Sequence, residues 1–293
     1  MSTTARAIDA SLKSREGLVW SGVLVALVFL LYAPILKPLV LQWWNDPDYS
    51  HGFFVPLFSA YVLWRGRKRW LETEMKPSNF GFLVMLAAIF LFLAGTLGAE
   101  LFTTRLSLLV LIAGMVIFLF GWKMLRAVSF PLGFLIFMIP LPALVYNQIT
   151  FPLQLLASRF ATFCLELLDV PVLREGNILL LPNYSLEVAE ACSGIRSMIN
   201  LIALATAYGY LAESRRWARY ALPILMVPIA ILSNAMRILG TGFMTYHFGA
   251  KAAEGFFHQF SGWIIFLVAI LLTFLCHLIL KRIGKDRSPK AHG

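Results

Sequence analysis

Three polar residues in a strongly apolar chain are of the types that carry out acyl transfer. Cys192 stands between small residues, directly before a long apolar run. Arg237 and His258 stand at the borders of two later apolar runs. A thiolate can attack a carbonyl carbon, a guanidinium can hold the resulting oxyanion, and an imidazole can move the proton. Joint action of the three requires that they face the same side of a membrane.

Each of these residues also has a structural interpretation. A cysteine packs well as a small apolar side chain at a helix start, although the dipole of that helix favours the thiolate. Arg237 could extend to the membrane interface or pair with an acid such as Glu190. His258 could be an interfacial histidine among aromatic residues, and His247 is a competing base on the same predicted loop. The residues alone leave these alternatives open.

Further polar residues are candidates for substrate binding. Arg196 lies just inside the predicted helix and could contact substrate, with Glu190 nearby, or hold the helix start. The segment Asn45–Gly52 contains Tyr49 and His51; it could cap the next span or line a substrate site, and the structural role is favoured. Its two carboxylates and one histidine do not make a zinc site. We therefore expect neither a metal ion nor a cofactor.

The composition indicates which elements must position these residues. The chain has 293 residues, of which 59% are hydrophobic, and its mean hydropathy is +0.77. Soluble domains contain about 45–50% apolar residues, so an all-α polytopic membrane protein is predicted. The net charge of +10 comes from short basic runs between apolar segments, and no nucleic-acid motif is present. Three cysteines are too few and too irregular for a disulfide framework.

About eight apolar runs are long enough, or nearly so, to cross a hydrocarbon core of about 30 Å. The whole chain is expected to form one transmembrane domain, with a polar tail at 1–17 in place of a cleavable signal peptide. The predicted spans are 18–41, 49–64, 80–98, 106–121, 127–146, 195–212, 218–238 and 262–280.

The basic residues orient the predicted spans. Five segments hold 18 of the 25 Lys and Arg: 1–17, 65–79, 122–126, 213–219 and 281–293. Because such residues gather on the cytoplasmic side, both termini are predicted to be cytoplasmic. This orientation brings Cys192, Arg237 and His258 to the outer face. It leaves His277 and Cys276 near the inner end of the last span, on the wrong side, and Cys164 reads as a buried residue.

One long outer-face loop is predicted at 147–194. Its first part, 152–168, has apolar residues at helical spacing and could lie on the membrane surface. Two short β-prone runs, 178–181 and 186–189, surround a Pro-Asn turn and predict a small hairpin that delivers the chain to Cys192.

Several stretches of the chain, in order, resemble the exosortase/archaeosortase family of membrane proteins. They are DPDYSHGFFVPLFSAYVLW at 46–64, FPLGFLIFMIPLP at 130–142, REGNILLLPN at 174–183, EACSGIRSMINLIALATAYGYL at 190–211, NAMRI at 234–238 and HQFSGW at 258–263. The resemblance implies that Cys192, Arg237 and His258 are the catalytic set. It also implies substrates that end in a short motif such as Pro-Glu-Pro, a transmembrane helix and a basic tail.

The resulting hypothesis is a cysteine transpeptidase or protease of the plasma (inner) membrane that cleaves C-terminal sorting signals at the outer, periplasmic face. Its expected partners are those membrane proteins, the lipid bilayer and an acceptor that the sequence does not identify. The alternatives from other classes are a membrane transporter and a scaffold component of polysaccharide export. Against a transporter, no predicted span has a charge at its centre, and no matching pair of broken half-helices is present.

Overall fold

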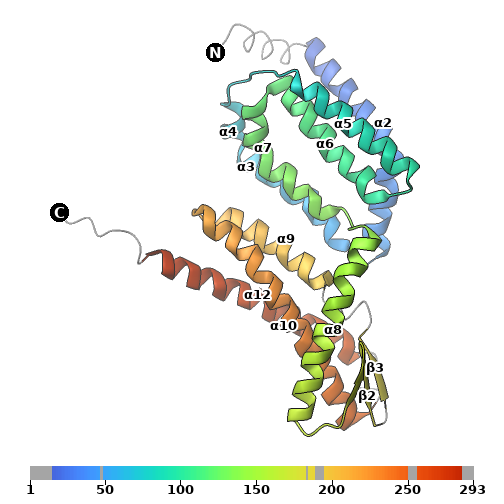
Figure 1. Ribbon diagram of the computed structural model, residues 1–293. Coiled ribbons are helices and arrows are strands. Elements are labelled where there is room, and N and C mark those ends of the chain that lie inside the picture. The colour runs from blue at the N-terminus through green and yellow to red at the C-terminus, as the bar shows by residue number, and fades with distance from the viewer. Residues whose placement is uncertain (1–14, 47–48, 183, 189–194, 250–255, 286–293) are drawn as a thin grey trace, which may run out of the picture. The chain divides into compact units, whose positions relative to one another are not determined.

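The computed structural model describes residues 15–46, 49–182, 184–188, 195–249 and 256–285, which are mostly helical (Figure 1). The chain forms two compact units, Met1–Pro142 and Ala143–Gly293. In both units large apolar side chains are exposed along the helices, among them Leu30, Phe90 and Ile224. Such surfaces suit a protein whose solvent is lipid, as the composition predicts.

The first unit is built from helices alone within its described residues. In chain order they are α2 (Arg15–Asn45), η1 (Ser50–Phe53), α3 (Phe54–Arg65), α4 (Arg67–Leu71), α5 (Phe80–Leu97), α6 (Leu101–Phe120), α7 (Trp122–Phe134) and the 3-10 helix η2 (Leu135–Met138). Tyr32 of α2 packs against Ala88 and Leu111 of the α5–α6 hairpin. Its hydroxyl is hydrogen-bonded to the Ser107 hydroxyl at 2.8 Å.

Glycine residues allow α5 and α6 to approach closely. A Cβ atom on Gly81 would overlap the backbone nitrogen of Phe118, and one on Gly114 would lie 2.8 Å from Cγ of Met85. Small residues permit such contact between membrane helices, where packing replaces the hydrophobic effect as the main attraction. The hairpin ends at Gly121, whose φ of +88° is a conformation that glycine adopts at little cost.

The predicted fifth span, 127–146, is wrong as a single helix. The chain is helical through Phe134, continues as η2 to Met138, and starts a new helix at Ala143. Pro140 and Pro142 lie in the interruption. A proline lacks the N–H that the helix needs and disfavours helical geometry at the residue before it, so two prolines two residues apart stop the helix that hydropathy alone would continue.

In its described residues, the second unit combines four helices with a small sheet. Its elements are α8 (Ala143–Leu167), β1 (Leu173–Glu175), β2 (Ile178–Leu181), β3 (Tyr184–Glu187), α9 (Ile195–Ala212), α10 (Arg216–Phe248) and α12 (Phe256–Lys285). The strands are antiparallel in the order β1-β2-β3, with Arg174 opposite Leu179 and Leu180 opposite Ser185. The predicted hairpin is confirmed as β2 and β3, whereas β1 was not predicted.

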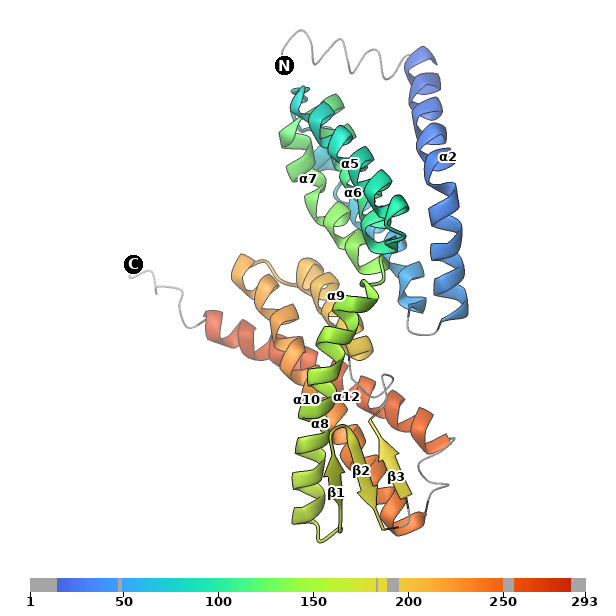
Figure 2. The ribbon, with the colours of Figure 1, turned by 45° about the vertical axis from the view of Figure 1, so that its right-hand side comes forward.

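The sheet packs against both α8 and the second half of α10 (Figure 2). Leu179 of β2 is fully buried with Ala161 of α8 and Ile238 of α10. A second cluster joins Leu165 of α8 and Leu181 of β2 to partly buried side chains farther along α10. Because of this cover, α10 continues for ten residues beyond the predicted span end at Ile238.

Helices α9, α10 and α12 form the second core of this unit. Leu201 and Ala205 of α9 are buried against Leu222 and Met226 of α10, and Cys276 of α12 packs on this cluster. The residues predicted as the span 195–212 form the helix α9 at the same boundaries, but this helix is not among those long and apolar enough to cross a membrane. The helix predicted within 152–168 is confirmed as part of α8, which starts earlier, at Ala143.

The described residues contain four helices long and apolar enough to cross a membrane, and a fifth if the helices on either side of residues 139–142 count as one span. The four lie in α2, α5, α6 and α10. The eight predicted spans are therefore not confirmed. The predicted second span is a clear difference, because α3 has only 12 residues, or about 18 Å at 1.5 Å per residue.

Candidate active site

Arg237 lies in the middle third of α10 on a stripe of polar residues. Its side chain is half-buried and its Nε atom is buried. Asn234, one turn before it, is only 5% exposed, and Ser233 and Thr241 lie four residues to either side. Residues three and four apart share a helix face. A polar stripe with a guanidinium at its centre is costly in an apolar helix, which marks it as a functional candidate.

The position of Arg237 along α10 gives its distance from the start of the helix. The helix has 33 residues and starts at Arg216. At 1.5 Å per residue, Arg237 lies about 32 Å from that start, close to the thickness of the hydrocarbon core. The remainder of α10 packs against the sheet and α8, with Gly242 close to Leu165. If Arg216 lies at one membrane interface, Arg237 lies at the other.

The packing of α9 on α10 brings the start of α9 to nearly the same level. A Cβ atom on Gly209 would lie 3.3 Å from the Arg219 carbonyl oxygen. The same number of residues leads from Gly209 to Ile195 along α9 as from Arg219 to Ser233 along α10. Ile195 is therefore level with Ser233, which lies one turn before Arg237. Arg196 is the second residue of α9; its side chain is not described. Asn200 follows four residues later, and its Oδ1 is buried without a hydrogen-bond partner among the described residues.

Two contacts fix how α12 runs along α10. The Thr273 hydroxyl donates to Sδ of Met226 at 2.9 Å, and Nη2 of Arg215 donates to the Leu280 carbonyl at 3.1 Å. Arg237 lies 22 residues after Arg215, and His258 lies 22 residues before Leu280. From the other contact, His258 is four residues farther from Thr273 along α12 than Arg237 is from Met226 along α10. His258 therefore lies within about one turn of the level of Arg237. It belongs to the first turn of α12, and its side chain is not described.

Cys192 and Glu190 lie outside the described residues. Cys192 precedes the first residue of α9, Ile195, by three positions in the chain, and three extended residues span at most about 10 Å. The chain connection alone therefore keeps Cys192 within about that distance of the start of α9.

His51 and Tyr49 belong to the first unit, whereas Arg196, Arg237 and His258 belong to the second. His51 lies in η1, and its Nε2 is 3.1 Å from the Phe137 carbonyl. The indole of Trp43 donates to the next carbonyl, that of Met138, at 3.0 Å. These two contacts satisfy carbonyls where η2 ends. They support the structural interpretation of Asn45–Gly52. Capping of the following helix is not part of that role, because Tyr49 precedes η1 and makes no side-chain cap hydrogen bond.

The sequence interpretation missed a charge inside a span. Arg105 is the fifth residue of α6 and only 4% exposed, although the predicted span began after it. Its Nη1 donates to Oε1 of Gln42 on α2 at 3.1 Å. Hydropathy excluded this residue because a charge normally ends an apolar run. Among the described residues, no group of three or more His, Cys, Asp and Glu could hold a metal ion.

Fold and site together define a helical membrane protein with a polar stripe at the junction of a long helix and a small sheet. The model of the transmembrane exosortase family matches residues 43–275, which include every candidate residue. The chain therefore belongs to this family, and membership indicates a membrane sorting enzyme. Neither curated proteins nor solved structures gave a match.

Proposed function

We propose that the protein is a cysteine transpeptidase or protease that cleaves the C-terminal sorting signals of exported proteins through a thioester on Cys192. Its substrates would have a short motif, a transmembrane helix and a basic tail. The apolar helix of the substrate would dock among the spans and present the motif at the outer face of the plasma membrane. Arg196 and Glu190 would contact the substrate near the reacting carbonyl.

In the proposed reaction, the thiolate of Cys192 attacks the scissile carbonyl carbon and forms a C–S bond. Arg237 donates hydrogen bonds to the oxyanion of the tetrahedral intermediate. The C–N bond then breaks, and the leaving nitrogen takes a proton from the His258 imidazolium. An amine acceptor or water attacks the thioester, gives its proton to His258, and releases the thiolate. The same residues would thus serve both transfer and hydrolysis.

The observation that carries this proposal is the common level of three chain positions. The start of α9, Arg237 and His258 come from separate parts of the sequence, and counting residues from helix contacts elsewhere puts the first and the third each within about one turn of the level of Arg237. An arginine in a polar stripe at this level supports the oxyanion role, because a guanidinium presents a planar fork of N–H donors to an anionic oxygen.

The test follows a tagged substrate in cells. Cys192→Ala and Cys192→Ser should each abolish processing, because neither a methyl group nor an unactivated hydroxyl replaces the thiolate. Cys164→Ser is the matched control, since this thiol lies in α8 and is not among the candidate catalytic residues; it should process normally. Immunoblots would compare processed substrate at equal enzyme levels. Normal processing by both Cys192 variants would refute the catalytic proposal and favour the transporter or scaffold.

Mass spectrometry of the processed substrate would identify what resolves the thioester. A free carboxylate at the new C-terminus means hydrolysis. An attached group means transfer, and its mass identifies the acceptor.

A further inference from the structure

We propose that Glu213, Arg215 and His277, which we call the inner clamp, set the register of α12 along α10 and thereby position His258 relative to Arg237. This inference rests on the proposed function and adds positioning residues to the same reaction. None of the three is near the predicted outer face. The sequence interpretation set His277 aside because it lies at the wrong end of its span.

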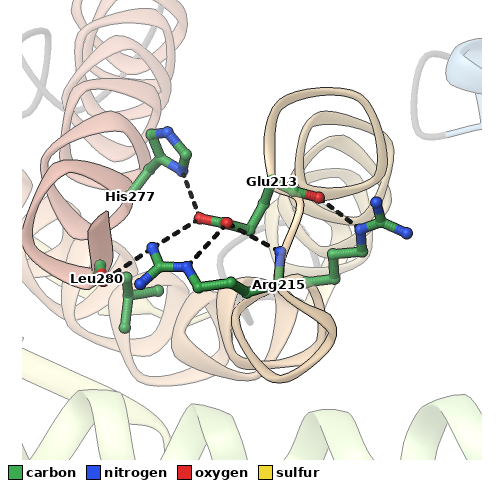
Figure 3. Close-up of polar contacts among 5 residues, drawn as sticks. Glu213, Arg215, His277 and Leu280 are labelled. Carbon is green, nitrogen blue, oxygen red and sulfur yellow. Dashed lines mark hydrogen bonds and ion pairs between the residues drawn. The ribbon is translucent and has the colours of Figure 1, made fainter. Parts of the chain in front are cut away.

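The inner clamp joins three helices through one carboxylate (Figure 3). Oε1 of Glu213 accepts from Nε of Arg215 at 3.1 Å, and Oε2 accepts from Nη2 at 3.2 Å. Nδ1 of His277 lies 3.9 Å from Oε2. The same Nη2 also donates to the Leu280 carbonyl of α12 at 3.1 Å. The turn between α9 and α10 is therefore bonded directly to the last part of α12.

Burial makes these contacts specific. Glu213 is 6% exposed and His277 is 7% exposed. The hydrogen bond from Arg215 is the main cause that lowers the pKa of the Glu213 carboxyl, against the opposing effect of its burial. Without the two hydrogen bonds from the Arg215 guanidinium, the buried negative charge of Glu213 would have no balancing positive charge. Any arrangement that separates the two side chains is therefore costly in free energy. The orientation of the Arg215 side chain is also fixed, because its guanidinium donates hydrogen bonds to both Glu213 and Leu280.

Apart from the hydrogen bond from Thr273 to Met226, the rest of the described α10–α12 contact selects a register only weakly. It consists largely of apolar side chains such as Leu222 and Cys276. Apolar surfaces in lipid tolerate sliding better than directional bonds do, since lipid tails solvate either arrangement. A slip of one turn would move α12 by about 5.4 Å. It would break the bond to the Leu280 carbonyl and displace His258 from the level of Arg237 by the same amount.

The inner clamp also lies at a matched distance from the two candidate catalytic residues. Arg215 and Leu280 are in contact, and 22 residues lead from Arg215 to Arg237 and from Leu280 to His258. The other ends of these two helix segments are therefore level to within the offset of about one turn that the Thr273–Met226 contact gives. A misplacement of about 1 Å at a catalytic group can cost about a hundredfold in rate, so a register error at the inner clamp reaches the chemistry without unfolding the protein.

The test compares two neighbouring arginines. Arg215→Ala removes the inner clamp, whereas Arg216→Ala removes the same charge from an exposed position that belongs to no described polar contact. In proteoliposomes with purified substrate, Arg215→Ala should lower kcat about tenfold or more and leave KM within about twofold. Arg216→Ala should change neither. A purely structural defect would lower the amount of active enzyme in proportion to folded protein, which active-site titration of Cys192 measures separately.

Register is measured without catalysis. The pair Met226→Cys and Thr273→Cys is introduced with Cys164→Ser and Cys276→Ser, and a short thiol crosslinker joins the contact that the structure shows. The yield should fall several-fold when Arg215→Ala is added and stay unchanged with Arg216→Ala. This readout remains valid if Cys192 proves not to be catalytic, so the failure of the proposed function and the failure of the inner clamp are distinguishable.

Two results would overturn the inference. One is equal kcat for the Arg215→Ala and Arg216→Ala enzymes. The other is a loss of kcat with an unchanged crosslink yield. If Arg215→Ala does not accumulate, Arg215→Lys is compared with Arg216→Lys. Lysine keeps the charge but has no planar fork to bond Glu213 and Leu280 together, so it should still reduce the crosslink yield and kcat.

Discussion

Two helix hairpins, α5–α6 and α9–α10, show different ways to hold neighbouring membrane helices. Each has one glutamate in its turn. Glu100 accepts hydrogen bonds from the backbone N–H groups of Phe102 and Thr103, so it caps its own helix α6. Glu213 instead binds Arg215 and faces His277 of a third helix. The first carboxylate acts locally, and the second connects elements.

The interhelical contacts differ in the same sense. Gly81, Gly95 and Gly114 bring the backbones of α5 and α6 together along their length. Between α9 and α10, the Gly209 contact at 3.3 Å is looser and lies close to the turn. Leu201 and Ala205 continue the contact toward the start of α9 through their side chains, which keep two helix backbones farther apart than glycine does. The candidate site lies toward that end, where the proposed substrate helix would enter.

The largest effect is expected from Gly81→Ala. The added Cβ would overlap the Phe118 backbone, which cannot move aside as a flexible side chain could, so the cost should be about 3 kcal/mol. The measurement is thermal unfolding in detergent. Gly22→Ala is the matched control, because nothing lies within 4 Å of a Cβ there; it should be neutral or slightly stabilising. Equal midpoints for the two variants would show that α5 and α6 do not need their glycines.

Glu213→Gln should have the next largest effect, about 2 kcal/mol at neutral pH, because a charged fork becomes a neutral contact. Arg215 and His277 face this carboxylate, whereas Nε of Arg219 donates to the backbone carbonyl of Glu213. The folded-state pKa of Glu213 lies below its ordinary 4.5. Its stabilisation is therefore present above pH 4.5 and is lost as the pH falls through the lower folded value.

Thermal midpoints of the Glu213→Gln variant and the unsubstituted protein should thus converge in acid. Glu187→Gln, on an exposed position of β3 in the same unit, is the control. A difference that stays constant down to strongly acidic pH would mean that the carboxylate charge contributes nothing.

The same distinction explains what the sequence could predict. Hydropathy located α5 and α9 almost to the residue, because a membrane helix must satisfy its own backbone in lipid and is apolar over a fixed length. Two β-prone runs around a turn signal located β2 and placed β3 two residues too late. These requirements are local, so they can be recognised from consecutive residues of the sequence.

Contacts between distant residues could not be predicted in this way. The bond from Arg215 to Leu280 joins positions 65 apart, and no spacing rule relates them. Helix α10 continues beyond its apolar run because Gly242 and its neighbours pack on α8 and the sheet. Hydropathy does not detect such packing. Within the candidate site, residue types suggested Arg237 and His258, but the contacts that make them level lie at the other end of the bundle.

The smallest effect is expected from Glu100→Ala, about 1 kcal/mol, which is typical of a lost helix cap. Burial raises the pKa of the Glu100 carboxyl, but hydrogen bonds from Thr103 and Phe102 together lower it below 4.5. Its stabilisation is therefore also present above pH 4.5 and lost in acid. Thermal unfolding in detergent at neutral and acidic pH measures it, with the exposed Glu72→Ala as the control.

Processing rates separate the two turn glutamates more sharply than stability does. Because Glu100 bonds only to residues two and three positions ahead, its loss should soften the first turn of α6 and leave processing within about twofold of normal. Glu213→Gln should reduce processing more than its stability cost predicts, since it also loosens the attachment of α12. If Glu100→Ala slows processing as much as Glu213→Gln at equal folded protein, a local cap and a connecting carboxylate do not differ in function, and the comparison of the two hairpins fails.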